Sequence, residues 1–567
     1  MIGPMMNDFL YALRNARAIS INHLGYETAG LKTAVFCLGD GGHASKCTLL
    51  RISDDQVVFT IPLSQPQAVA GWKGNSYQVI DFSEFTTPGS YRICVYDTTH
   101  TPEYSEDFEI AAALYHPQLS RMMLGYFQSQ RCGDQYTDTT VPFFSGKRTG
   151  HVDVHGGWYD ASGDVSKYLS HLSYANYMNP QQTPLVVWAL ANAAENSSTD
   201  LGDDFGREAV WGADFLVRMF DPAGYFYMTV FDKWSGDVEQ REICSYSTQD
   251  GIKHDSWQAG FRQGGGMAIA ALARLSRLGK DGDFSAGHYG EIAQQGFQHL
   301  LTHNTQYLDD GVANIIDDYC ALLAAVELHR ATDNPDYIMH ADNFAKNLMA
   351  RLTKDGWWHA DANGARPFFH ASDAGMPMVA LAAYAEICGA AEKQNVVDAL
   401  NKSVQHLNDI THAVFNPFSY PRQFVKSSAG ALGSQFFFPH ENESGYWWQG
   451  ENARLASIAY GLKCAKPLVD SALHMVCDAH VQHAIDWILG LNPYQSCMMQ
   501  GVGRNTPTYQ PAKFPNVDGG ICNGITSGLE NEADIGFCDT EDPMQSWRWS
   551  EQWLPHAAWF LLAVSAK

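Results

Sequence analysis

The chain has 567 residues, of which 45% are hydrophobic and 17% are charged, and this balance predicts a well-buried protein of two domains. It carries 37 basic and 62 acidic residues, a formal charge of −25, which opposes binding to nucleic acid or to an anionic membrane because both would repel it. A small neutral or cationic ligand fits this charge better.

The N-terminal residues contain no uninterrupted apolar segment, because Asn7, Asp8 and Arg14 break the apolar positions that an export signal needs. No run approaches the roughly 20 apolar residues of a membrane span. The twelve cysteines are scattered without a C-x-x-C pair. In a chain of this length without an export signal, they are expected to be reduced and mostly buried rather than joined in six disulfides. We therefore expect a cytoplasmic protein.

The first part of the chain has the two-residue hydrophobic period of β-strands. Apolar Tyr91, Ile93 and Val95 alternate with Arg92 and Cys94, as a half-buried strand requires. Turn-forming residues separate the six strands expected here, which are residues 33–38, 48–52, 57–61, 77–82, 91–96 and 106–110. This pattern predicts an immunoglobulin-like β-sandwich domain over residues 1–112.

After His116-Pro117 the hydrophobic period changes to about 3.6 residues, which is typical of helices. Twelve helices are expected, at residues 117–129, 184–196, 207–220, 265–278, 289–303, 318–331, 335–352, 375–390, 393–407, 452–463, 470–489 and 552–565. Twelve helices in antiparallel pairs predict an all-α (α/α)6 barrel over residues 113–567. An open helical solenoid is the alternative, and the lack of a fixed repeat length disfavours it.

Two carboxylates, Asp160 and Asp164, lie four residues apart in a loop of small and aromatic residues. Small residues let the backbone turn tightly, so both carboxylates could point at one water molecule and serve as a catalytic base. An Asx-turn or a helix cap with a solvated second aspartate is the alternative reading.

Glu551 leads into the last helix among four tryptophans. An apolar, aromatic setting raises the pKa of a carboxyl and keeps it protonated, as a general acid requires at neutral pH. The alternative is that Ser550 and Glu551 only cap the helix and complement its dipole.

These motifs, taken in order, resemble glycoside hydrolase family 9 with its N-terminal immunoglobulin-like domain. The resemblance spans nearly the whole chain and is carried by the segments Ile21 to Tyr26, Tyr126 to Gly133, Asp160 to Asp164, Trp448 to Asn452, Ile488 to Pro493 and Ser550-Glu551. It implies that Asp164 is the base, that Asp160 helps to hold the water, and that Glu551 is the general acid. It also implies inversion of the anomeric configuration, with the acid and base on opposite sides of the sugar.

Three departures from the family pattern bear on the substrate. The aspartate motif has one extra residue, D-A-S-G-D, the loop at Trp448 differs, and the P-H-H-R sugar-binding motif of typical cellulases has no match. The variant motifs most resemble the bacterial exo-β-D-glucosaminidases of this family, which act on chitosan oligosaccharides. This resemblance implies release of glucosamine from the non-reducing end, with the C2 ammonium held by Asp160 and Asp164. The alternative is a cellulase-type endoglucanase or a β-glucosidase acting on β-1,4-glucan.

Substrate-binding residues are expected in two loops that are rich in aromatic and polar side chains, because such residues stack on sugars and bond their hydroxyls. They are Trp448, Glu451, Tyr446, His440, His254 and Asp255. Packing between helices is the alternative for each residue of the aromatic run at 436–448.

No cofactor or metal is expected. Gly264 to Gly266 favours close helix packing over a phosphate site, and the acidic residues at 530–542 lack the spacing of a calcium loop. The expected partner is a small oligosaccharide, with neither nucleic acid nor membrane, and the oligomeric state is left open. Two rival classes remain: a lyase or epimerase on the same fold, and a non-catalytic sugar-binding protein.

Overall fold

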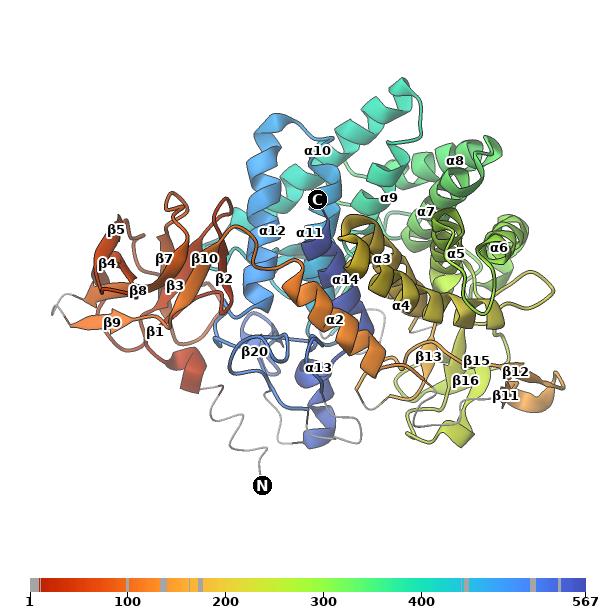
Figure 1. Cartoon of the computed structure of the whole chain (residues 1–567), viewed down its shortest axis with the longest axis horizontal. Helices are drawn as coiled ribbons and strands as arrows, with labels where there is room; N and C mark the ends of the chain where they lie inside the picture. The colour runs from red at the N-terminus through yellow and green to blue at the C-terminus, as the bar shows by residue number, and fades with distance from the viewer. Residues whose placement is uncertain are drawn as a thin grey trace.

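The computed structural model describes residues 10, 12–97, 101–132, 140–162, 164–171, 177–439, 441–442, 448–509, 516–538 and 542–566. Figure 1 shows a β-rich N-terminal region at one side of the molecule, in contact with a larger helical region that contains the rest of the chain. No helix within the described ranges is long and apolar enough to cross a membrane. Ten of the twelve cysteines are buried, as predicted.

The N-terminal region is a sandwich of two sheets. One sheet has the order β1-β3-β7-β6 and the other β2-β10-β8-β4-β5, with β9 paired to β8. The six predicted strands are confirmed, as β3 (Thr33–Cys37), β4 (Ala44–Arg51), β5 (Val57–Ile61), β7 (Ser76–Asp81), β8 (Gly89–Asp97) and β10 (Phe108–Ala111). The pattern missed four short strands, β1 (Ala18–Ser20), β2 (Gly25–Glu27), β6 (Gln67–Ala68) and β9 (Pro102–Tyr104), which are too short to show a period.

Strand β3 is buried on both faces, and this explains why its residues do not alternate between apolar and polar. Ala34 and Phe36 face the core between the two sheets, whereas Val35 and Cys37 belong to the core of the helical region. Trp72 extends this contact, with its ring centroid 5.1 Å from that of Phe436. The sandwich therefore covers an apolar flank of the helical region.

All twelve predicted helices are present. They are α2 (Gln118–Ser129), α3 (Thr183–Asn196), α4 (Thr199–Arg218), α5 (Gly266–Leu278), α6 (Ala286–Tyr307), α7 (Ile315–Thr332), α8 (Asp336–Ala350), α9 (Met376–Tyr384), α10 (Ala390–His412), α11 (Asn452–Ala465), α12 (His474–Ile488) and α14 (Leu554–Ser565). The largest boundary difference is at the start of α4, where Ser198 precedes a polar first turn that carries little hydrophobic signal.

Six of these helices form an inner ring, in which α3 contacts α5, α5 contacts α7, and the series continues through α9, α11 and α14 back to α3. The inner helices are apolar on nearly every side, as helices buried within a domain must be. The outer helices α4, α6, α8 and α12 pack chiefly against α3, α5, α7 and α11, in that order. This arrangement is consistent with the predicted (α/α)6 barrel.

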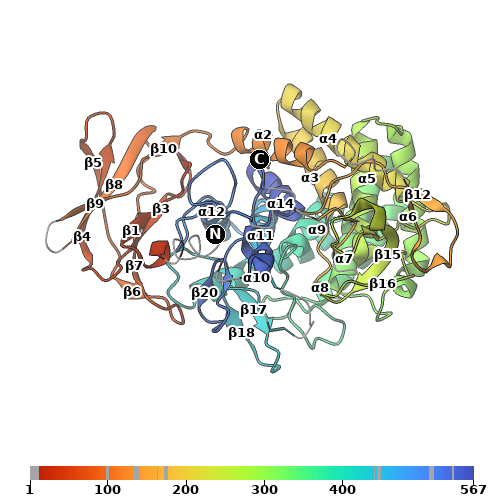
Figure 2. The ribbon, with the colours of Figure 1, turned by 90° about the horizontal axis from the view of Figure 1, so that it is seen from below.

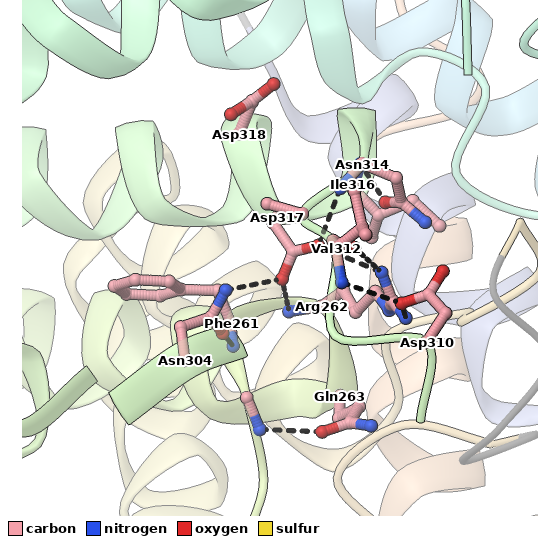
Figure 3. A network of polar contacts seen from close by, with 12 residues as sticks. Phe261, Arg262, Gln263, Asn304, Asp310, Val312, Asn314, Ile316, Asp317 and Asp318 are labelled. Atoms are coloured by element: carbon pink, nitrogen blue, oxygen red, sulfur yellow. Dashed lines mark hydrogen bonds and ion pairs between the residues drawn. The ribbon is translucent and has the colours of Figure 1, made fainter. Parts of the chain in front are cut away.

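The start of α5 is held by a buried ionic network around Arg262, in the π-helical turn Phe261–Gly265 that precedes it (Figure 3). The Arg262 guanidinium lies 3.2 Å from Asp317 and 2.9 Å from Asp310. Breaking such a buried pair is costly because it leaves an unpaired charge. The network therefore fixes the turn against the first turn of α7.

Gly264 lies in the same turn, at a φ of 97°, and a Cβ there would approach the Cβ of Leu169 to 2.4 Å. A Cβ at Gly266 would approach the Cβ of Cys320 in α7 to 2.7 Å. The glycines thus serve close packing, as predicted, and they bring the loop that contains Leu169 against the helices.

The long loops gather at one end of the helical region, where Figure 1 shows β13, β15, β16 and α13 below the helices. Four short strands form a sheet there in the order β13-β14-β15-β16, namely β13 (Lys167–Tyr168), β14 (Thr229–Phe231), β15 (Glu242–Ser247) and β16 (Ile252–His254). The short helix α13 (Trp547–Ser550) lies at the same end. Figure 2 shows the pair β17 (Gln423–Lys426) and β18 (Leu432–Gln435) as seen from below. The other two-stranded pairs are β11 (Thr140–Pro142) with β12 (His151–Asp153) and β19 (Thr526–Ser527) with β20 (Ile535–Gly536).

Candidate active site

A cleft with a volume of about 620 Å³ opens among these loops. The three residues predicted to be catalytic, Asp160, Asp164 and Glu551, all line it. Its walls are aromatic and polar, and they include Trp234, Trp547, Trp553, Tyr509, His171, His370, Gln249, Gln449 and Arg548. Such a combination of flat aromatic faces and hydrogen-bonding groups suits a sugar chain.

Residues 160–162 pair with residues 552–554, although these two segments are nearly four hundred positions apart in the sequence. The N–H of Ser162 donates to the carbonyl of Gln552 at 3.0 Å, and the N–H of Gln552 donates to the hydroxyl of Ser162 at the same distance. The N–H of Leu554 donates to the carbonyl of Asp160 at 3.1 Å. This pairing fixes the aspartates relative to Glu551, which lies beside Gln552.

The residue by which D-A-S-G-D departs from the family pattern lies in a tight turn. The N–H of Asp164 donates to the carbonyl of Ala161 at 3.2 Å, so the two carboxylates are brought back to the same wall of the cleft. The longer motif therefore preserves the paired placement that the sequence predicted.

Asp160 is 3% exposed, and its carboxylate accepts a hydrogen bond from the indole N–H of Trp553 at 3.1 Å. Burial raises the pKa of Asp160 well above its usual range, and the charges of Asp164 and Glu551 raise it further. One donor does not offset this effect, so Asp160 holds a proton more readily than an ordinary aspartate.

Asp164 is also buried, and burial, followed by the charge of Asp232, raises its pKa. Its carboxylate accepts two hydrogen bonds, from the N–H of Ser166 at 2.8 Å and from the hydroxyl of Tyr168 at 3.1 Å. Both favour the ionised form. Of the two aspartates, Asp164 is therefore the better base. The Ser166 contact has the spacing of an Asx-turn, so that alternative reading describes part of what Asp164 does.

Glu551 lies in extended backbone between α13 and α14, and α14 begins at Leu554 with no side-chain cap. The helix-cap alternative for Glu551 is therefore wrong. Burial raises the pKa of Glu551 well above its usual range, with the charge of Asp164 next, while a hydrogen bond with Tyr509 acts in the opposite direction. A carboxyl in this state keeps its proton near neutral pH, as a general acid must.

His171 lines the cleft beside Asp160. Its Nε2 lies 3.8 Å from an Asp160 oxygen, and its Nδ1 lies 3.2 Å from the hydroxyl of Tyr246. Burial lowers the pKa of His171 to about 3, so the ring is neutral. In the described part of the chain, Asp160, Asp164 and His171 are the group whose ligand atoms, all within 4.8 Å of one another, could hold a metal ion. The same spacing suits a single water molecule held between the two carboxylates.

The structure corrects the expectation that Glu451 binds substrate. Glu451 is 2% exposed, and its carboxylate accepts hydrogen bonds from Tyr420 at 3.0 Å and Gln423 at 3.0 Å, and pairs with Arg454. These contacts occupy both oxygens, so Glu451 holds the loop against α11. The ring centroid of Trp448 lies 6.0 Å from that of Trp549, and Trp448 is not among the residues that line the cleft, although its neighbour Gln449 is.

The structure also leaves His254 and Asp255 outside the cleft. His254 contacts the hydroxyl of Ser247 at 2.8 Å within its own hairpin, and Asp255 pairs with Lys147. His440 and Tyr446, the other two predicted binding residues, lie outside the described residues. The cleft residues that the sequence did not indicate include His171, His370, Trp234 and Tyr509, which come from four separate loops.

A cleft in which buried carboxyls with raised pKa values face aromatic walls has the chemistry of a glycoside hydrolase. The sequence matches the profile of glycosyl hydrolase family 9 over residues 116–518 and that of the cellulase N-terminal ig-like domain over residues 14–100. The chain therefore belongs to glycoside hydrolase family 9, with an N-terminal immunoglobulin-like domain before the catalytic domain.

Similar proteins of known activity are endoglucanases. Endoglucanase C of Cellulomonas fimi is 26% identical over 260 residues, which are 38% of this chain and only 23% of that protein. Endoglucanase 15 of Arabidopsis thaliana is 24% identical over 424 residues, 69% of this chain and 77% of the relative. A metagenome-derived family 9 endoglucanase superposes with a TM-score of 0.68 at 19% identity, covering 96% of this chain and 98% of that structure, which shows the shared fold. These relatives give no support to the exo-β-D-glucosaminidase subtype.

Proposed function

We propose that the chain is an inverting hydrolase of β-1,4-glucan that cleaves internal bonds, as an endoglucanase does. The observation that carries the proposal is the cleft in which Asp160, Asp164 and Glu551 meet between aromatic walls. The endoglucanase relatives support the choice of a neutral glucan as substrate.

The three carboxyls suit a single-displacement reaction. Ionised Asp164 removes a proton from water, which Asp160 helps to orient, while protonated Glu551 donates its proton to the glycosidic oxygen. The water oxygen bonds to the anomeric carbon as the bond to the leaving sugar breaks. Asp164 ends protonated and Glu551 ionised, and exchange with solvent restores both.

The walls provide for sugar rings without requiring a charged ligand. Trp234 lies at the rim, 37% exposed, and its ring centroid is 5.1 Å from that of the buried Phe231, which holds it in place. Trp547 and Trp553, from the C-terminal part of the chain, also line the cleft. Flat indole faces pack on the apolar faces of glucose units at little cost in side-chain entropy.

The test is a comparison of kcat/KM for cellohexaose and for the glucosamine hexamer, with the products separated by size. We expect the glucan to be preferred and to give products from internal bonds. The variants Asp164→Asn and Glu551→Gln should each lose roughly 1,000-fold in kcat. Asp255→Asn, which removes a carboxylate outside the cleft, is the matched control and should keep its activity. Preference for the glucosamine hexamer, with release of monomers only, would overturn the proposal.

A further inference from the structure

His370 lies on the wall of the cleft, in the loop between α8 and α9, and only 1% of it is exposed. Its Nδ1 accepts two backbone hydrogen bonds, from the N–H of Ser372 at 2.9 Å and from the N–H of Asp373 at 2.8 Å. A ring nitrogen that accepts from N–H groups carries no proton. The proton of the neutral ring is therefore on Nε2.

The ring is neutral at any pH at which the enzyme is expected to work. Burial, together with the charge of the nearby Arg366, lowers the pKa of His370 to about 3. His370 therefore presents one N–H donor and, at Nε2, no acceptor.

That donor has no hydrogen-bond partner among the described residues. Leaving a buried N–H unsatisfied costs about 1 to 3 kcal/mol. A ligand that accepts a hydrogen bond from this N–H removes that cost, and the difference favours binding. Other buried nitrogens are unsatisfied too, including both ring nitrogens of His480, but His480 is in α12 and does not line the cleft.

The backbone that fixes the ring is itself held. The carboxylate of Asp373 accepts the indole N–H of Trp559 at 2.9 Å on one oxygen and the backbone N–H of Gln181 at 2.9 Å on the other. These contacts tie the loop to α14 and to the segment before α3. The His370 ring is thus placed before any ligand arrives, which lowers the entropic cost of binding.

We propose that His370 is a substrate-binding residue whose Nε2–H donates a hydrogen bond to the C2 hydroxyl oxygen of a glucose unit, the position at which glucosamine carries its ammonium, and that it thereby selects hydroxylated over aminated rings. The inference rests on the proposed function and names the residue that enforces the choice of a neutral glucan.

The selection follows from hydrogen-bond polarity and charge. A hydroxyl oxygen accepts from N–H, whereas a sugar ammonium has only donors, so its contact with Nε2–H is repulsive. A site that bonds a hydroxyl rejects analogues that cannot accept, because its buried group is then left unpaired.

The test uses the full-length chain and three variants, with kcat/KM measured on cellohexaose and on the glucosamine hexamer. His370→Leu removes the donor, His370→Gln keeps an N–H donor near the Nε2 position, and His480→Leu is the matched control for loss of a buried histidine outside the cleft. We expect His370→Leu to lose about 10-fold on cellohexaose and little on the glucosamine hexamer. We expect His370→Gln to recover most of the loss and His480→Leu to match the wild type on both substrates.

Unchanged activity of His370→Leu on cellohexaose, or an equal loss on both substrates, would overturn the inference. If His370→Leu does not fold, ¹⁵N-histidine spectra of Glu551→Gln decide: added cellohexaose should shift the Nε2–H signal that His370→Gln abolishes, and an unmoved signal would overturn the inference. Wild-type inactivity on cellohexaose would instead defeat the proposed function. The two failures are therefore distinguishable.

Discussion

The indole N–H of Trp553 donates to the carboxylate of Asp160 at 3.1 Å. The backbone of Trp553 also forms an antiparallel bridge with that of Ala161, the residue after Asp160. The contact joins the loop that carries both aspartates to the segment that carries Glu551. It is also the one side-chain hydrogen bond that lowers the otherwise raised pKa of Asp160.

Replacing Trp553 by phenylalanine should therefore raise the pKa of Asp160 further, since the ionised form loses its donor. A protonated Asp160 is a poorer acceptor for the water that Asp164 activates. The acidic limb of the profile of kcat/KM against pH should therefore move upward, and kcat at neutral pH should fall several-fold. Trp448→Phe, a change of the same kind at a residue that does not line the cleft, should leave the limb in place. An unmoved limb in Trp553→Phe would show that this bond does not control the ionisation of Asp160.

Glu551→Gln should have two effects: it should abolish turnover, and it should raise the free energy of unfolding. Because burial raises the pKa of Glu551 in the folded chain, this carboxyl contributes stability that is complete below its unfolded pKa and is lost as the pH rises through the folded value. Glutamine avoids that loss. The variant should exceed the wild type by about 1 to 2 kcal/mol at pH 8, and the difference should disappear near pH 4. Thermal unfolding at both pH values measures it, and a variant less stable than the wild type at pH 8 would contradict the raised pKa.

His480 should make the fold sensitive to acid. It is buried in α12 with both ring nitrogens unsatisfied, its ring centroid lies 5.8 Å from that of His412, and burial lowers its pKa to about 3. Between pH 6.5 and 3 the unfolded chain binds a proton there that the folded chain does not, so stability falls as the pH falls.

His480→Leu removes this proton uptake and fills a similar volume. Its stability advantage over the wild type should grow by about 2 kcal/mol between pH 8 and pH 5. Denaturant unfolding at the two pH values gives the difference. An advantage that is the same at both would mean that His480 is protonated in the folded chain.

Trp72 tests the junction between the sandwich and the helical region. It is 6% exposed and contacts Phe418, Phe436 and Phe437 of the helical region. Trp72→Ala should cost about 3 to 5 kcal/mol of stability, because it leaves a cavity among aromatic rings. At temperatures where the variant is folded, kcat should be unchanged, since the cleft lies elsewhere. Val57→Ala, at a side chain that is 55% exposed, should change neither quantity. A loss of kcat in folded Trp72→Ala would contradict this expectation and would show that packing at the junction affects the geometry of the cleft.

The sequence predicted the fold well because hydrophobic periodicity is a local signal. It located the twelve long helices and the six longer strands of the sandwich. Strands of two or three residues were missed because they hold less than two periods, and β15, β17 and β18 were missed because they lie in the loops of the helical region. Strand β3 was found although both its faces are buried, because Thr33 to Leu38 is a short apolar run between turns.

The site was predicted in part. Asp160, Asp164 and Glu551 lie in recognisable motifs, and the structure brings them into one cleft. His171, His370 and Trp234 carry no motif, and only the folding of separate loops brings them together. The prediction that Glu451 binds substrate was wrong, because a carboxylate in an aromatic loop has the same sequence pattern whether it faces a ligand or pairs with a buried residue such as Arg454. The departure at D-A-S-G-D pointed to a different substrate subtype, yet with the turn at Ala161 both carboxylates line the cleft.

The most direct test of the account is proton NMR of the first products released from cellohexaose by the wild-type chain. A base at Asp164 and an acid at Glu551, acting on opposite faces of the sugar, should give the α-anomer first, and the β-anomer should appear only later by mutarotation. The β-anomer as the initial product would contradict the assignment of Asp164 and Glu551 as an inverting pair.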